Sequence, residues 1–436
     1  MHTVLQILNL AGSLGLFLYG MTLMSESLQK IAGDRLRRIL SSITSNPLKG
    51  VLTGVAITSL IQSSSATTVM VVSFVNAGLL TLTQAIGVIM GANIGTTVTA
   101  WIVSLVGFKA DIAILAIPLI AVGFVMFMSK KQKRKNTGEM LIGFALLFLG
   151  LTFLKDSMPD LSSSPETLKF LQNFTGHGFW SVLIFVGIGT LLTMILQSSS
   201  ATVALTLVMV NYGWIPFEIA ASMVLGENIG TTITANIAAA VGNVSAKRAA
   251  LAHTFFNVIG VIWAVALFRP FLRLVGAIIT GLGGADPFIP IAQAADPVAS
   301  GNAMIYSVSL LHTMFNLINT TLLIWFVPIL VKIVTFVIKS PKEEEKYRLK
   351  FIQAGLLSTA ELSIDQAKQE IIHFGNIITR QYAIIRNALD VKDNDEFDTL
   401  FNKISYYEEV TDRIEFEIAE YLNKIGDEGI SAESGN

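Results

Sequence analysis

Two short polar stretches in this chain carry the residues that could do chemistry. The first, Gln62–Thr68, begins Gln-Ser-Ser-Ser-Ala-Thr, and the same six residues begin Gln197–Val203, 135 positions further along (197 − 62 = 135). A second motif, Gly-x-Asn-Ile-Gly-Thr-Thr, occupies Gly91–Thr97 and returns as Gly226–Thr232 at the same spacing (226 − 91 = 135). Two motifs that recur at one offset indicate a duplicated structural unit rather than chance composition.

The residue types in these motifs suit the binding of small ions. Serine hydroxyls both donate and accept hydrogen bonds, and backbone N–H groups at the start of a helix attract anions. The oxygen atoms of Gln62, Gln197, Thr96 and Thr231 could coordinate Na⁺, a hard cation that takes oxygen ligands. No Lys or Arg lies in either motif, so bound sodium would supply the positive charge that an anion site needs. Three serines in each copy are the candidate anion ligands: Ser63, Ser64, Ser65, Ser198, Ser199 and Ser200.

A simpler role remains open for the same residues, because Ser, Thr and Gly also serve helix packing in membranes. Glu227, which replaces Ala92 in the second copy, is the one acid within the motifs. Intramembrane acids are functional by default, so it is either an ion or proton site or the partner of Lys247 or Arg248.

A third pattern is His-Thr-x-Phe-Asn, which occurs at His253 to Asn257 and again at His312 to Asn316. Residues at i and i+4 share one helix face. A polar pair that packs helices together is favoured here over a substrate contact.

Composition places the motifs in a membrane. The 436 residues are 52% hydrophobic and 14% charged with mean hydropathy +0.63, whereas soluble domains carry about 25% charged residues. The absence of cysteine excludes disulfides and thiolate metal ligands. Residues 340–436 hold 20 acidic and 11 basic side chains, a net −9, and the other 339 residues carry +8. An acidic soluble tail therefore follows a basic membrane domain, and nothing suggests nucleic acid as a partner.

Apolar stretches of spanning length alternate with two pairs that are too short to cross alone. The short pairs, 48–61 with 69–80 and 179–196 with 203–210, flank the Gln-Ser-Ser-Ser motifs and predict re-entrant helical hairpins with serines at their tips. Glycines are expected to break the helices that carry the second motif. The longer stretches are expected at Val4–Met24, Leu82–Val106, Ile112–Met128, Met140–Phe153, Ile219–Val241, Ala249–Phe268 and Ala303–Val337.

Charge and span number together predict the topology. Five Lys and Arg residues within 130–135 mark a cytoplasmic turn, and residues 25–49 are also expected to be a polar cytoplasmic segment. Three full spans separate the hairpins, so equivalent elements must face opposite ways. The expected fold is therefore an all-α membrane protein with an inverted-topology repeat, about 46–128 and about 178–268, as in many secondary transporters.

After Pro341 the pattern changes to charged helices with apolar residues at helical spacing. Three helices are expected, at Arg348–Leu357, Ala360–Leu389 and Glu396–Lys424, with a turn at Asp393. Such a tail suits a small cytoplasmic helical bundle.

Paired Gln-Ser-Ser-Ser motifs, each followed by Gly-x-Asn-Ile-Gly-Thr-Thr, resemble the type II sodium-phosphate cotransporter family from about Gly12 to Lys339. The resemblance implies inorganic phosphate as substrate and Na⁺ as coupling ion. It implies that phosphate is held by the six serines with Asn93 and Asn228. The resemblance and the oxygen chemistry of the motifs, with the lone acid Glu227, together indicate these candidate sodium ligands: Gln62, Thr67, Thr96, Thr97, Gln197, Thr202, Glu227, Thr231 and Thr232.

The tail looks like one half of a PhoU-like phosphate-regulatory domain. Its Glu408-Glu409-Val-Thr-Asp412 segment is similar to that domain's acidic metal-binding signature, although an acidic solvated helix face is the favoured explanation. The expected domains are thus a transport domain, 1–339, and a cytoplasmic PhoU-like domain, 340–436.

The sequence leads to one hypothesis and three alternatives. The hypothesis is a sodium-coupled phosphate symporter of the inner membrane that works by alternating access, with no organic cofactor, lipid and phosphate as partners, and a possible homo-oligomeric state. The alternatives are a transporter of another oxyanion such as sulfate, a phosphate sensor that acts through the tail, and an intramembrane serine hydrolase using His253 or His312. A nucleophile is needed only once, so two symmetrical serine rows favour a non-enzymatic protein.

Overall fold

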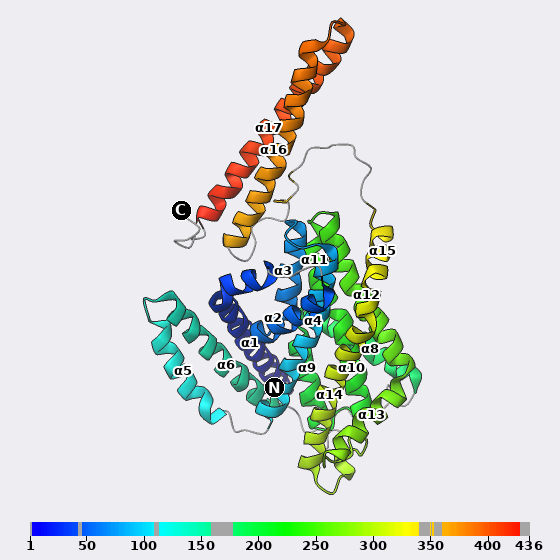
Figure 1. Ribbon diagram of the computed structural model, residues 1–436. Helices are drawn as coiled ribbons and strands as arrows, with labels where there is room; N and C mark the ends of the chain where they lie inside the picture. The colour runs from blue at the N-terminus through cyan, green and yellow to red at the C-terminus, as the bar shows by residue number, and fades with distance from the viewer. Residues whose placement is uncertain are drawn as a thin grey trace.

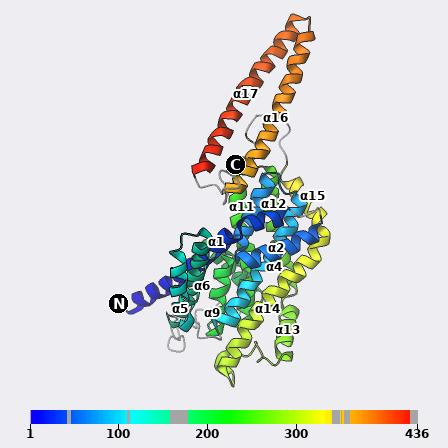
Figure 2. The ribbon, with the colours of Figure 1, turned by 60° about the vertical axis from the view of Figure 1, so that its left-hand side comes forward.

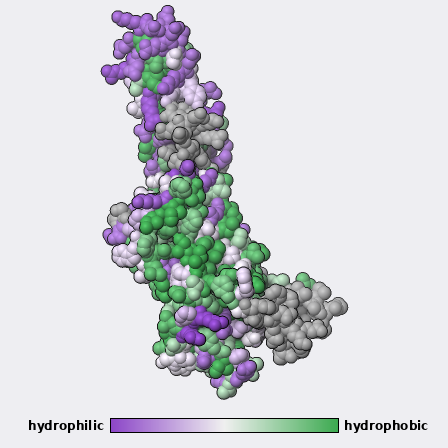
Figure 3. Space-filling model, turned by 90° about the vertical axis from the view of Figure 1, so that its right-hand side faces the viewer, coloured by the Kyte–Doolittle hydropathy of each residue, from purple (hydrophilic) through white to green (hydrophobic). Residues whose placement is uncertain are grey.

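The chain folds into helices that form a membrane-spanning body and a projecting hairpin (Figure 1). The computed structural model describes residues 2–41, 46–108, 113–157, 178–339, 349, 351–352 and 360–427, and no strand occurs among them. Hydrophobic surface gathers around the body, whereas the hairpin is largely hydrophilic (Figure 3). Six described helical segments are long and apolar enough to cross a bilayer: Leu8–Ala32, Leu82–Gly107, Gln132–Ser157, Phe179–Leu196, Val244–Ala266 and Pro297–Val337. The expected all-α membrane protein is confirmed.

The first copy of the repeat begins with two short helices that meet at the Gln-Ser-Ser-Ser motif. Asn46 caps the first of them with a side-chain hydrogen bond to the Leu48 amide (2.9 Å), and Pro47 stands at its first turn. A capping box of Thr81 and Gln84 starts the third helix. The three helices are α2 (Pro47–Ile61), α3 (Ser64–Asn76) and α4 (Leu82–Ile102), and a short π-helical turn (Val103–Gly107) extends α4.

The second copy repeats this order with one difference. Its helices are α8 (Phe179–Leu196), α9 (Ser199–Asn211), α10 (Phe217–Gly230) and α11 (Thr232–Ala240). α10 and α11 are separated at Thr231, whereas α4 runs without interruption through Gly91–Thr97. The expectation that glycines break both helices is therefore wrong for the first copy.

The glycines of α4 and α10 are used for close helix packing instead. A Cβ atom on Gly91 would lie 1.9 Å from the carbonyl oxygen of Val51 on α2, and one on Gly226 would lie 1.9 Å from that of Val186 on α8. Because Val186 follows Val51 by the same 135 residues (186 − 51 = 135), both copies make the same backbone contact. Small residues allow helix backbones to approach this closely in membranes. This packing outweighs the weak helix propensity of glycine.

A group of three further helices lies against the first copy (Figures 1 and 2). They are α1 (His2–Ser41), α5 (Ala113–Phe127) and α6 (Gln132–Ser157). α1 and α6 pack along their lengths through glycines such as Gly20, which touches the backbone at Leu147. The segment 25–49, expected to be polar and cytoplasmic, is helical up to residue 41, where α1 ends. Its polar side chains bond to a neighbouring helix, as Ser27 and Lys30 do with Glu139 on α6 (3.5 and 3.3 Å).

The remaining membrane helices fill the space beside the two repeats. α14 packs against α4, α9, α10, α12 and α13, and contributes buried Leu311 and Phe315 to the largest apolar core. Asp296 caps this helix, and Pro297 stands at its first turn. The four helices are α12 (Val244–Ala266), α13 (Phe268–Gly281), α14 (Pro297–Leu323) and α15 (Val327–Val337).

The tail forms an antiparallel pair of long helices, α16 (Ala360–Asp390) and α17 (Asn394–Asp427). The predicted turn is confirmed, since the Asp393 carboxylate accepts hydrogen bonds from the amides of Asp395 and Glu396. The expected helix at Arg348–Leu357 is not found: Leu349, Phe351 and Ile352 are non-helical, and its other residues lie outside the described part of the chain. Among described residues the tail is thus a two-helix hairpin.

Candidate functional site

The two Gln-Ser-Ser-Ser tips have the same backbone conformation. Gln62 and Gln197 adopt the left-handed conformation, with φ of 59° and 52°, and are the only non-glycine residues with positive φ in the described structure. The next residues, Ser63 and Ser198, are extended (φ −146° for both) and cap α3 and α9. Left-handed residues other than glycine are uncommon and store strain. The left-handed conformation at equivalent positions shows that both copies form the same sharp turn.

The turn makes each tip the start of a helix. The Ser63 hydroxyl oxygen accepts from the Ala66 amide (3.1 Å), and that of Ser198 accepts from the Ala201 amide (3.3 Å). The first backbone bond of each helix comes later, from Thr67 to Ser63 and from Thr202 to Ser198. The amides of the second and third serines therefore have no carbonyl partner in their own helix. These N–H groups and the positive end of the helix dipole favour an anion.

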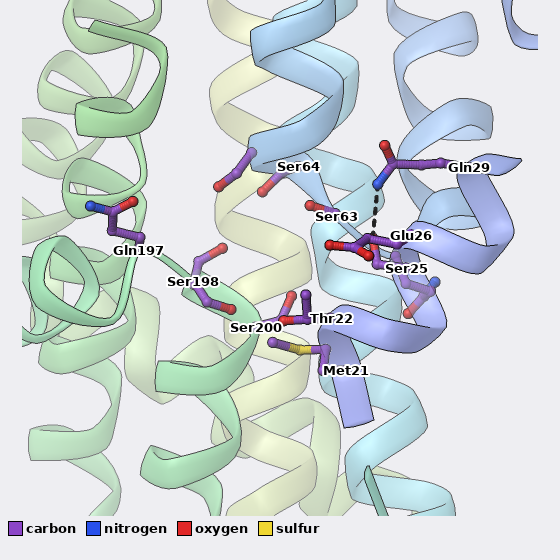
Figure 4. A pocket seen from close by; sticks show the side chains of 13 residues that line it. Met21, Thr22, Ser25, Glu26, Gln29, Ser63, Ser64, Gln197, Ser198 and Ser200 are labelled. Atoms are coloured by element: carbon purple, nitrogen blue, oxygen red, sulfur yellow. Dashed lines mark hydrogen bonds between the residues drawn. The ribbon is translucent and has the colours of Figure 1, made fainter. Parts of the chain in front are cut away.

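Both tips open into one cavity of about 210 Å³ (Figure 4). Figure 4 shows the serines of α3 and α9 facing each other across it, with α1 closing a third side. The eight residues of the two motifs that line it are Gln62, Ser63, Ser64, Ser65, Gln197, Ser198, Ser199 and Ser200. The structure thus brings together the two distant motifs that the sequence predicted to share one site.

The third wall of the cavity was missed by sequence reasoning. It is formed by α1 through Met21, Thr22, Ser25, Glu26 and Gln29. The Gln29 amide donates to the Ser25 hydroxyl at 3.3 Å. The spacing i, i+3, i+4 and i+7 of Thr22, Ser25, Glu26 and Gln29 places these polar residues on one helix face, and this is the signal that could have identified the wall.

The asparagines of the second motif lie outside the cavity lining. Asn93 donates to the side-chain oxygen of Asn257 (3.3 Å) and lies 3.4 Å from Nε2 of His253. Asn228 donates to the Val224 carbonyl of its own helix (2.8 Å). These contacts join α12 to α4, as a helix-packing role for His253 and Asn257 predicts.

The threonines predicted for sodium also lie behind the tips rather than in the cavity lining. Their hydroxyls donate to carbonyl oxygens three or four residues earlier in the chain, at distances between 2.7 and 3.0 Å. A donating hydroxyl keeps its oxygen lone pairs, so this bonding leaves each one able to coordinate a cation. The six are Thr67, Thr96, Thr97, Thr202, Thr231 and Thr232.

Glu227 is buried, with 1% of its surface exposed, and is hydrogen bonded to Thr206 on α9 (2.8 Å). Its other carboxyl oxygen has no hydrogen-bond partner in the described structure. Arg248 donates instead to the Ile338 carbonyl (2.8 and 3.0 Å), and no ion pair joins Glu227 to Lys247 or Arg248 among the described residues. The proposed ion pair is therefore wrong.

The described part of the tail contains no cluster of side chains that could bind a metal ion. No group of three His, Asp or Glu residues that could hold a metal occurs among the residues described. Glu409 lies 3.7 Å from Arg413 on the exposed face of α17.

The fold and the site together indicate the class of protein to which this chain belongs. Multiple spanning helices, a duplicated unit and a polar cavity between the two copies are the architecture of secondary transporters. The sequence profile of the Na⁺/Pi-cotransporter family matches residues 16–156 and 161–285, which is more than half of the chain. The chain belongs to this family.

Individual relatives agree with this membership. The chain is 34% identical over 280 residues to the uncharacterized protein YqeW of Bacillus subtilis, covering 64% of this chain and 86% of YqeW. It is 25% identical over 398 residues to YjbB of Salmonella typhimurium, whose name assigns it provisionally to inorganic phosphate export, covering 90% of this chain and 67% of YjbB. Human sodium-dependent phosphate transport protein 2B shares 44% identity over 102 residues, 23% of this chain and 15% of that protein. No solved structure matches the chain significantly.

Proposed function

We propose that this protein is a sodium-coupled symporter of inorganic phosphate, which works by alternating access around the cavity between the two tips. One observation carries the proposal: two Gln-Ser-Ser-Ser tips that lie 135 residues apart in sequence (197 − 62 = 135) line one cavity with the starts of α3 and α9. Serine hydroxyls and free amide groups on two opposite walls can donate hydrogen bonds to the oxygens of one tetrahedral anion.

The charge of the cavity supports a coupled cation. Its lining contains no Lys, Arg or His, and its single charged side chain is Glu26. Phosphate in such a site is unfavourable unless positive charge enters with it, because unpaired charges in a partly buried site are costly. Sodium bound by the oxygens of Gln62, Gln197 and the neighbouring threonines would supply that charge.

Organisation of the chain is proposed as a transport domain, 1–339, followed by a cytoplasmic regulatory domain, 340–436. Three helices, α4 to α6, are described between the two short-helix pairs, and an odd number of crossings gives repeats of opposite orientation. The basic residues within 130–135 lie in the turn between α5 and α6 and in the first turn of α6, so we assign this side and the tail to the cytoplasm of an inner-membrane protein.

The test is uptake of ³²P-phosphate into proteoliposomes with and without an inward sodium gradient. Wild type is expected to take up phosphate only with sodium. The double variant Ser64→Ala/Ser199→Ala is expected to lose most uptake, because it removes one cavity hydroxyl from each tip. Ser307→Ala is the matched control, since Ser307 is buried on α14 and bonds to Ala303 within its own helix (2.8 Å).

The alternatives give different results in the same vesicles. Sulfate in place of phosphate as the transported ion would indicate another oxyanion transporter, and phosphate binding without flux would indicate a sensor. Outward sodium gradients test export, the direction in the name of YjbB. A serine hydrolase is disfavoured because neither His253 nor His312 lines the cavity, and His253 contacts Asn93 instead of a serine.

A further inference from the structure

The cavity contains one group whose chemistry differs from the rest of its lining. Hydroxyls and carboxamides both donate and accept hydrogen bonds, so they accommodate any tetrahedral oxyanion. Glu26 is different because a carboxylate accepts hydrogen bonds and donates none. It is exposed on α1, and Figure 4 shows it projecting from that helix into the space bounded by the serines.

A carboxylate in an anion site treats protonated and unprotonated anions in opposite ways. An anion that carries an O–H group can donate a short, charge-assisted hydrogen bond to it. A tetrahedral anion without a proton meets only lone pairs and like charge, which is unfavourable. Near neutral pH inorganic phosphate and arsenate carry at least one proton, whereas sulfate carries none.

The surroundings leave Glu26 available for this contact. No salt bridge or hydrogen bond of its side chain occurs among the described residues, and the nearby Gln29 amide is directed to Ser25 (3.3 Å). The amides at the starts of α3 and α9 lie on the other walls and donate. Donors on two walls and one strict acceptor on the third match an anion that has both bare oxygens and a hydroxyl.

We propose that Glu26 is a specificity-determining residue that accepts a hydrogen bond from the P–OH group of the anion and so excludes proton-free anions such as sulfate. This inference rests on the proposed function, since it concerns the anion that the same cavity transports. It assigns to α1, a helix outside both repeats, the discrimination that the paired serines cannot provide.

The experiment is competition for sodium-driven ³²P-phosphate uptake by the full-length protein at a fixed neutral pH. The competitors are arsenate, sulfate and monofluorophosphate, in which fluorine replaces the hydroxyl of phosphate. In wild type, arsenate is expected to inhibit uptake at about the same concentration as unlabelled phosphate. Sulfate and monofluorophosphate, the two proton-free anions, should need roughly 10- to 100-fold higher concentrations for the same inhibition. In Glu26→Gln this gap, the ratio of inhibitory concentrations between proton-free anions and arsenate, is expected to shrink about tenfold. The amide can donate to a bare oxygen and carries no charge.

Glu415→Gln is the matched control, because Glu415 is an exposed acid on α17 far along the chain from the cavity, and it should keep the wild-type gap. If Glu26→Gln fails to transport, the same four anions are compared by the rise in melting temperature that each produces in the detergent-solubilised variant. Closure of the gap there supports the proposal equally.

Three results would overturn the proposal while leaving the transporter intact. They are full discrimination in Glu26→Gln, wild-type competition by monofluorophosphate as strong as by arsenate, and a changed sodium requirement in Glu26→Gln with unchanged anion selectivity. The last would make Glu26 a cation ligand. Absence of any sodium-dependent phosphate uptake or phosphate stabilisation in wild type would instead remove the proposed function itself, and this inference with it.

Discussion

Gln62 and Gln197 occupy equivalent positions in the two repeats and share a left-handed backbone, yet their side chains are held very differently. The Gln62 amide donates to the Ser59 carbonyl (2.5 Å), its oxygen accepts from Thr99 (3.0 Å), and the residue is buried. Gln197 is exposed and makes no side-chain hydrogen bond within the described structure. The backbone of the tip is therefore conserved between copies, whereas the bonds that fix it are present in the first copy alone.

The two repeats also differ in the helices behind the tips. In the first repeat α4 is continuous, and the positions equivalent to Glu227 and Thr206 are Ala92 and Val71. In the second repeat the helix is divided at Thr231, and a buried Glu227–Thr206 pair joins α10 to α9. Each repeat thus supplies the same serine row, but the second carries extra polar groups whose burial is costly without a function.

The largest effect is expected where the two repeats are most alike, at their helix crossings. Gly91→Val and Gly226→Val should each destabilise the protein by about 3 kcal/mol or more, because the new side chain would overlap the backbone of α2 or α8. Melting temperature and the yield of monodisperse protein in detergent measure this.

The control for this prediction is the residue next to Val186, whose carbonyl oxygen contacts Gly226. Gly187 is on α8 beside Val186, and a Cβ there would meet nothing within 4 Å. Gly187→Ala should therefore leave the melting temperature almost unchanged. A tolerated Gly226→Val would show that the crossings of the two repeats are not equivalent.

These glycines also show what the sequence could and could not predict. Repeated spacing was enough to predict both short helix pairs, with α8 at its observed bounds, and to predict that the two distant motifs lie together. The continuity of α4 was not predictable from local propensity, because helix packing at Gly91 and Gly95 outweighs it. The α1 wall was missed because Ser25–Gln29 has no repeated counterpart. Its polarity suggested a cytoplasmic segment, since its polar contacts with α6 could not be known from the sequence.

A smaller effect is expected where the repeats differ in how the tip is fixed. Gln62→Ala removes two hydrogen bonds of a buried amide and leaves the Thr99 hydroxyl without its acceptor, so it should cost roughly 2 kcal/mol. Gln197→Ala removes an exposed side chain and should change stability by less than about 0.5 kcal/mol. Chemical or thermal unfolding of the two variants side by side measures the difference. Equal losses would contradict the unequal fixing of the tips.

The smallest effect concerns sodium and the extra acid of the second repeat. Glu227→Gln keeps the size of the side chain and removes its charge, so the sodium concentration for half-maximal uptake should rise about tenfold, equivalent to about 1.4 kcal/mol. At saturating sodium the half-saturating phosphate concentration should stay unchanged, because Glu227 lies outside the cavity lining. Thr206→Val introduces the residue found at the equivalent position of the first repeat, Val71, and removes only the hydrogen bond to Glu227. It should also raise the sodium concentration for half-maximal uptake, but by less than Glu227→Gln. If Glu227→Gln keeps the wild-type sodium dependence, the buried acid has a structural role, and the sodium ligands must be sought among the oxygens that both repeats share.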